Sequence, residues 1–147
     1  MPSKKIDPAD LPDVNVLIAL VHPAHVHHAQ AFDWFSETES YVTTPVTEAG
    51  FIRLALNQSV MGGPVSFAEA MVSLSSVKRD PRAQFLADDA TFSQPRIALD
   101  GLFGHQQVTH MHLVNLASRH GARLVTFDRR IAGTLVDRDR DYVKIIG

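Results

Sequence analysis

Cysteine is absent from the 147-residue sequence, which excludes disulfide bridges and thiol chemistry. No apolar run approaches the roughly 20 residues that a membrane-spanning helix needs. The first such run, from residue 11, is interrupted by Asp13 and closed by His22 and Pro23, so it does not resemble a secretion signal. We therefore expect a cytoplasmic protein. The net charge of -2 creates no overall field for nucleic acid, so binding of this kind would need a local basic cluster.

The length and composition are those of one globular domain, which we expect to span residues 1–147. With 45% hydrophobic and 20% charged residues, the chain has enough apolar material for a core of its own. A chain of this size buries about two thirds of the surface that its unfolded form exposes.

Short apolar segments alternate with helical patterns along the chain. The strand-like segments are 11–15, 41–44, 84–87, 122–127 and 142–146, of which 84–87 is expected at an edge. The first helical segment runs from the end of the first strand to Pro23. The others are 24–40, 45–57, 66–79, 92–103, 108–121 and 128–135. Apolar strands without alternating polar residues are typical of a parallel sheet buried on both faces. The fold class is therefore α/β, with three layers around a short central parallel sheet.

Spacing also predicts which side chains these helices bury. In 24–40 the apolar face predicted by spacing contains Val26, Ala29, Phe32 and Phe35. We expect the core to contain the larger aromatic side chains Trp34, Phe35, Phe51 and Phe67.

Three acids stand where parallel strands end. Asp13 ends the first strand, Glu48 follows the second, and Asp128 comes directly after 122–127. Ligands bind beyond the carboxyl ends of such strands, and clustered carboxylates need a cation such as Mg²⁺ or Mn²⁺. Each acid also has a purely structural interpretation, as a helix cap for Asp13 and Asp128 and as a dipole partner for Glu48.

Three stretches together resemble a known family: LPDVNVLIALVHPAHVHHAQAFDWF, TTPVTEAGFIRLALN and QVTHMHLVNLASRHGARLVTFDRR. They are similar to the PIN-domain ribonucleases of VapC toxin type, and the likeness is weakest from about residue 62 to 104. The resemblance implies a PIN-like fold, RNA as the substrate, a VapB-type antitoxin as the partner, and a homodimer. It also implies that one or two Mg²⁺ or Mn²⁺ ions activate water to cleave the RNA backbone.

The resemblance assigns roles to residues by position. Asp13, Glu48 and Asp128 match three of the family's metal-binding acids, and Asp13 is the ligand that two ions would share. Asn15 and Thr126 match polar positions that hydrogen-bond the acids or a metal-bound water.

His110 departs from the family pattern, because the run THMHLVNLA has His where the family has a further Asp. An imidazole brings a nitrogen ligand without a negative charge, which favours Mn²⁺ relative to Mg²⁺. We consider His110 as a catalytic metal ligand or water-positioning base, as a contact to substrate or antitoxin, or as a sign of a weakened site.

Other polar residues near these motifs have several interpretations. Arg129 and Arg130 directly follow Asp128 and are the candidates for RNA phosphate contacts. His25 and His28 are one helical turn apart, but zinc is disfavoured because the sequence has no HExxH motif or cysteine. The stretch around them resembles a WPxHxxH feature of the family, which indicates a structural or substrate-contact role.

Further residues of the second half have structural interpretations. His112 is expected in packing, and Asp88 and Asp89 in a solvated turn.

The leading hypothesis is a metal-dependent endoribonuclease toxin. The alternative is a catalytically weakened PIN-fold domain that binds RNA or protein. An α/β phosphohydrolase or phospho-receiver is disfavoured, because Asn15 stands where the DxDxT motif has its second Asp.

Overall fold

The computed structural model describes residues 8–147 and contains a five-stranded sheet in the order β3-β2-β1-β4-β5. All neighbouring strands are parallel, which confirms the predicted α/β class. The strands are β1 (Asp10–Pro12), β2 (Tyr41–Thr43), β3 (Ala83–Phe85), β4 (Arg123–Thr126) and β5 (Val143–Ile145).

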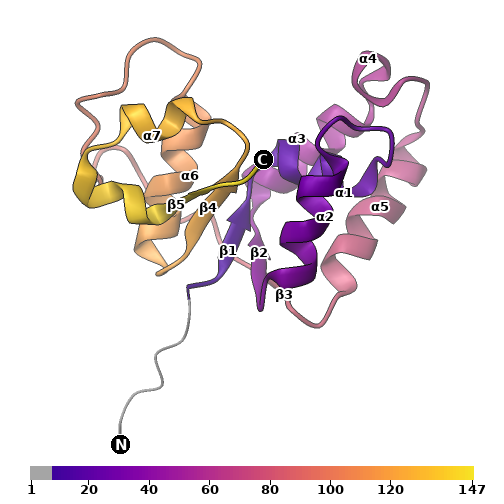
Figure 1. The fold of residues 1–147 in the computed structure, drawn as a ribbon, viewed down its shortest axis with the longest axis horizontal. Helices are drawn as coiled ribbons and strands as arrows, with labels where there is room; N and C mark the ends of the chain where they lie inside the picture. Colours follow the sequence, from indigo (N-terminus) through magenta and orange to yellow (C-terminus); the bar gives the residue numbers. More distant parts are fainter. Residues whose placement is uncertain (1–7) are drawn as a thin grey trace, which may run out of the picture.

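Helices cover both faces of the sheet, as Figure 1 shows. One side carries α1 (Val14–Val21), α2 (His28–Glu37), α3 (Pro45–Ala55), α4 (Gln58–Met61) and α5 (Phe67–Arg79). The other carries α6 (Val108–Arg119) and α7 (Arg130–Thr134), followed by the 3₁₀ helix η1 (Asp137–Tyr142) before β5. Within residues 8–147, none of these helices has the length and apolar character to cross a membrane.

Two hydrophobic cores lie on opposite faces of the sheet because successive strand residues point to opposite sides. In β2, Tyr41 packs into the core under α1, α2, α3 and α5, while Val42 packs into the core under α6. In β4, Val125 packs into the same core as Tyr41, and Leu124 packs into the same core as Val42. Full burial of each such side chain contributes about 1.5–3 kcal/mol.

Local signals set several helix ends as the sequence predicts. Ser66 caps α5 and forms a capping box with Glu69, through hydrogen bonds of 3.1 and 3.2 Å. Pro45 occupies the first turn of α3, where its missing N–H costs nothing. Gly121 follows α6 with a φ of 64°, a conformation that glycine adopts without strain.

Two predicted boundaries near the N-terminus are wrong. β1 ends at Pro12, so Asp13 and Asn15 lie at the start of α1 rather than inside a strand. The second helix begins only at His28, because residues 22–27 form a loop. Its buried face consequently contains Ala31 and Trp34.

The predicted apolar face of that helix is correspondingly wrong at three positions, one of which is the exposed Ala29. Val26 is 81% exposed in the loop, and Phe32 is 54% exposed on the solvent side of α2. Phe67, also predicted in the core, is 61% exposed at the first residue of α5.

The predicted helix over 92–103 is also wrong, since this segment contains turns and no helix. Side chains that are distant in sequence form hydrogen bonds with its backbone groups instead. Asn115 accepts a hydrogen bond from the Arg96 N–H at 2.8 Å and donates one to the Thr91 carbonyl at 3.2 Å. Asp139 accepts from the Ala98 N–H at 2.8 Å.

The strand order creates a crevice at the carboxyl ends of β1 and β4. From β1 the chain adds β2 and β3 on one side of the sheet and β4 and β5 on the other. Loops leaving β1 and β4 therefore diverge, and such switch points are where open α/β sheets bind ligands. Asp13 follows β1 and Asp128 follows β4 at this crevice.

Candidate active site

Asp13 is a buried carboxylate whose partners lie on two elements. Its side chain is 3% exposed, and Oδ1 accepts a hydrogen bond from the Val16 N–H at 3.1 Å, which caps α1. Oδ2 accepts a hydrogen bond from the Thr126 hydroxyl at the end of β4. Asp13 therefore caps α1 through Oδ1, while Oδ2 faces the candidate site, so both interpretations of this residue hold.

Asp128 lies beside Asp13 and is held by Arg130 and Gln107. The Arg130 side chain donates to Oδ1 through Nε at 2.9 Å and to Oδ2 through Nη2 at 2.9 Å. Gln107 Nε2 donates to Oδ2 at 3.1 Å. The hydrogen bonds from Arg130, followed by the one from Gln107, hold the pKa of Asp128 well below its usual value. Thr126 Oγ1 also accepts from the Asp128 N–H at 3.1 Å, so this hydroxyl links the two acids.

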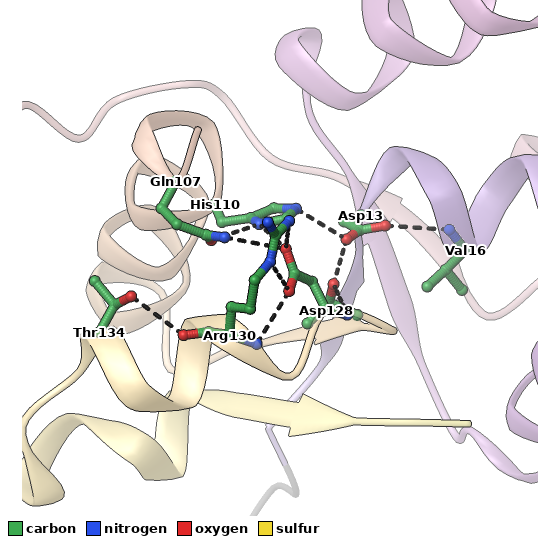
Figure 2. Close-up of polar contacts among 8 residues, drawn as sticks. Asp13, Val16, Gln107, His110, Asp128, Arg130 and Thr134 are labelled. Atoms are coloured by element: carbon green, nitrogen blue, oxygen red, sulfur yellow. Dashed lines mark hydrogen bonds and ion pairs between the residues drawn. The ribbon is translucent and has the colours of Figure 1, made fainter. Parts of the chain in front are cut away.

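His110 projects from α6 into the space between these two acids, as Figure 2 shows. Its Nε2 lies 3.3 Å from Asp13 Oδ2, and its Nδ1 lies 3.5 Å from Asp128 Oδ2. The hydrogen bond to Asp13, helped by the charges of both acids and opposed by burial, raises the pKa of His110. The imidazole therefore faces the two acids directly.

Glu48 does not join this group. It accepts hydrogen bonds from Thr43 Oγ1 at 2.7 Å and from Lys78 Nζ at 2.8 Å. In the part of the chain that the structure describes, no three His, Asp or Glu side chains form a ready ligand set for a metal ion. The structure thus brings Asp13, Asp128 and His110 together and leaves Glu48 paired with Lys78 from α5.

A hollow of about 350 Å³ opens beside the two acids. Asn15 and Thr126 line it, and of these Thr126 is buried whereas Asn15 is exposed at the rim. The loop between α1 and α2 adds His25 and His27, and the His27 ring stacks on Phe127 with centroids 4.6 Å apart. Burial, followed by the charges of neighbouring histidines, lowers the pKa of His25.

Both arginines that were predicted to contact RNA have partners within the chain. Arg130 holds Asp128, although its own side chain is 69% exposed. Arg129 Nη2 donates to the Gly147 carbonyl at 2.8 Å.

The remaining histidines lie away from the two acids. His28 Nδ1 lies 2.7 Å from the Ala19 carbonyl oxygen. His112, predicted in packing, lies edge-on to Phe92 with ring centroids 5.9 Å apart, and its Nε2 also forms a 2.6 Å pair with Asp88. Asp89 pairs in the same way with His120, so the predicted solvated turn at Asp88 and Asp89 is tied to α6.

Gln107 belongs to the site but was not predicted from the sequence. Gln107 contacts both His110 and Asp128, and its only signal is its spacing three residues before His110, which places both on one helix face. The stretch around His25, which was expected to have a structural or substrate-contact role, lines the hollow through His25 and His27.

The chemistry of the donors fits a divalent cation, provided that the present partners move. Asp13 and Asp128 offer carboxylate oxygens and His110 offers a nitrogen, a set that Mn²⁺ accepts more readily than Mg²⁺. Arg130 now occupies both oxygens of Asp128, and the raised pKa of His110 favours its charged form. A bound cation would take the place of the Arg130 guanidinium and of the extra proton of His110 beside the two acids.

The raised pKa of His110 predicts a pH dependence of stability in the metal-free protein. Protonated His110 is favoured in the folded state, so its contribution is complete below the unfolded value of 6.5. We expect that contribution to disappear as the pH rises from 6.5 through the higher folded pKa. Urea unfolding at several pH values, with chelator present, measures this effect.

The matched variant for this measurement is His110→Asn. Subtracting its unfolding free energy from that of the wild type removes contributions from the other histidines. The difference should decrease with rising pH, and a difference independent of pH between 6 and 9 would refute a raised pKa (about 1.36 kcal/mol accompanies each pKa unit).

Comparisons with known proteins give the family. No family model matches the chain. It is 37% identical to ribonuclease VapC38 of Mycobacterium tuberculosis over 136 residues, which cover 91% of this chain and 95% of that protein. It is 43% identical to ribonuclease VapC39 of the same species over 123 residues, which cover 82% and 88%.

A solved structure supports the fold. The crystal structure of Mycobacterium tuberculosis VapC20, described as a sarcin-ricin loop cleaving toxin, matches with a TM-score of 0.57. It covers 88% of this chain and 98% of that one at 13% identity, so this likeness bears on the fold alone. With the sequence identities above, the five-stranded parallel sheet and the acids at its switch point, the chain belongs to the family of VapC ribonucleases.

Proposed function

We propose that the chain is an endoribonuclease toxin of a type II toxin-antitoxin system and that it needs Mg²⁺ or Mn²⁺ to hydrolyse RNA. The observation that carries this proposal is the convergence of Asp13, Asp128 and His110 at the switch point of the sheet. The relatives with which it shares 32–43% identity are named ribonucleases.

Asp13, Asp128 and His110 are the residues that would hold the cation. A bound divalent cation supplies Lewis acidity, which activates water for attack on a phosphodiester and offsets charge on the phosphate. Thr126 fixes Asp13 by donating to Oδ2, so this carboxylate keeps its orientation when other partners change. Because one ligand is an imidazole, we expect Mn²⁺ to support more activity than Mg²⁺.

Arg130 would exchange a carboxylate for a phosphate during binding of RNA. Its guanidinium is exposed and reaches Asp128 from the α7 side of the hollow. With Asp128 holding a cation, the Arg130 guanidinium would be free to contact an RNA phosphate, for which its planar geometry is well suited. Arg130 would thus pair with Asp128 in the metal-free protein and contact RNA in the metal-bound protein.

Glu48 would contribute only to a second ion. The Lys78 ammonium at 2.8 Å now neutralises it, and that pair would have to open before Glu48 could bind a metal. We infer one ion at Asp13, Asp128 and His110, with Glu48 as the ligand of any further ion.

The partners expected from the family are part of the proposal. We infer that a VapB-type antitoxin restrains the enzyme, that the toxin forms a homodimer and that it acts in the cytoplasm.

Metal removal and replacement test the proposed function. We expect purified protein to cleave single-stranded RNA, to lose this activity in EDTA, and to regain it with Mn²⁺ and to a smaller extent with Mg²⁺. Asp137→Asn is the matched control, because the Asp137 side chain is 93% exposed and lies outside the hollow. Equal cleavage with and without EDTA would refute the metal dependence.

The alternative of a weakened RNA- or protein-binding domain has one observation in its favour. Arg130 and His110 already balance much of the negative charge of the two acids. RNA binding without any cleavage at saturating Mn²⁺, with both acids intact, would select this alternative.

A further inference from the structure

Gln107 lies at the N-terminus of α6 and spans two residues of the site with one amide group. Its side chain faces His110 and Asp128 in Figure 2, and the residue is 8% exposed. Oε1 lies 3.0 Å from His110 Nδ1, and Nε2 lies 3.1 Å from Asp128 Oδ2. The proposed function gives this residue no role of its own in holding a cation.

The direction of both hydrogen bonds follows from the acceptor at Asp128. A carboxylate oxygen only accepts, so the amide group facing Asp128 must be the NH₂ group. Reversing the amide would set its oxygen against the carboxylate oxygen, acceptor against acceptor. The amide oxygen therefore faces His110 Nδ1, and this nitrogen must donate.

Donation from Nδ1 determines the state of the other ring nitrogen. A neutral imidazole carries one N–H, so a proton at Nδ1 leaves a lone pair at Nε2. In the charged ring Nε2 donates to Asp13 Oδ2 at 3.3 Å, but this oxygen also accepts from Thr126 and is the one acceptor facing Nε2 among the contacts of His110. Nδ1, in contrast, has a second acceptor at 3.5 Å in Asp128 Oδ2. Both neighbours of Nδ1 thus favour the same tautomer.

We propose that Gln107 is a positioning residue that fixes the proton of neutral His110 on Nδ1 and directs the Nε2 lone pair toward the cation position beside Asp13. A histidine that binds a metal through one nitrogen usually donates from the other, and this partner sets its orientation. Gln107 and His110 would together take the place of the acid that the family has at position 110. The consequence for the metal rests on the proposed function, whereas the tautomer does not.

Nitrogen NMR of the metal-free, RNA-free protein tests the tautomer. At a pH that leaves the ring neutral, we expect a pyrrole-type shift for His110 Nδ1 and a pyridine-type shift for Nε2. Gln107→Leu removes the acceptor and should move the equilibrium toward the Nε2–H form, donating to Asp13. A wild-type proton on Nε2, or wild-type shifts in Gln107→Leu, would overturn the proposal.

Mn²⁺ titration without RNA tests whether Gln107 acts through His110. Gln107→Leu should weaken Mn²⁺ binding by about 10-fold, as is typical of a lost partner of a metal ligand. The same substitution in a His110→Asn background should have no further effect. An equal loss in both backgrounds would show action through Asp128 alone and would overturn the positioning role. Absence of Mn²⁺ binding in the wild type would count against the proposed function, and the NMR result would still decide the tautomer.

Discussion

Asp13→Asn is expected to lower RNA cleavage by at least about 100-fold, because loss of a metal ligand should exceed the 10–100-fold effect of losing a ligand's partner. The substitution removes the negative charge that His110 and a cation share. It keeps an oxygen for the Val16 N–H, and Asn caps helices as well as Asp. The loss of activity should therefore occur without loss of the fold.

Cleavage rates at saturating Mn²⁺ and thermal unfolding of the same samples measure this prediction. Asp137→Asn changes an exposed Asp in the same way and should match the wild type in both measurements. If Asp13→Asn cleaved RNA within a few-fold of the wild-type rate, Asp13 would be only a helix cap.

Asp10→Ala is expected to lower the free energy of unfolding by about 3 kcal/mol, within the range for breaking a buried charged network. Asp10 is 3% exposed in β1, and Oδ2 accepts from Trp34 Nε1 at 2.7 Å and from Thr38 Oγ1 at 2.9 Å. Arg123 Nε donates to Oδ1 at 2.8 Å. The substitution leaves the Trp34 N–H buried without a partner, while Arg123, whose side chain is 35% exposed, can still be hydrated.

Urea unfolding with Asp137→Ala as the control measures the Asp10 effect. A surface substitution of this kind usually changes stability by less than about 0.5 kcal/mol. Asp10→Ala should also lower Tm by roughly 6–12 °C, at about 2–4 °C for each kcal/mol in a chain of this size. A loss below about 1 kcal/mol would indicate that water replaces the carboxylate around Trp34.

Much of the fold could be predicted because its signals are local. Pro45 at the start of α3, the Ser66–Glu69 capping box and Gly121 after α6 each act within a few residues. The segment 92–103 could not be predicted in this way. Its helical spacing competes with hydrogen bonds from Asn115 and Asp139, which are distant in sequence.

The candidate site was predictable where strand ends determine it. Asp13 and Asp128 follow neighbouring parallel strands, so topology alone brings them together. Glu48 also follows a strand of the sheet, but Lys78, thirty residues further along the chain, pairs with it. Gln107 was missed because an amide near a helix start has many structural uses, and only the fold reveals its two contacts.

A crystal structure with Mn²⁺ bound, located by its anomalous scattering, tests the central claim most directly. We predict a Mn²⁺ peak in contact with Asp13, Asp128 and His110 Nε2, with the Arg130 guanidinium turned away from Asp128. A structure at saturating Mn²⁺ with no peak beside Asp13, and with Arg130 still on Asp128, would contradict it.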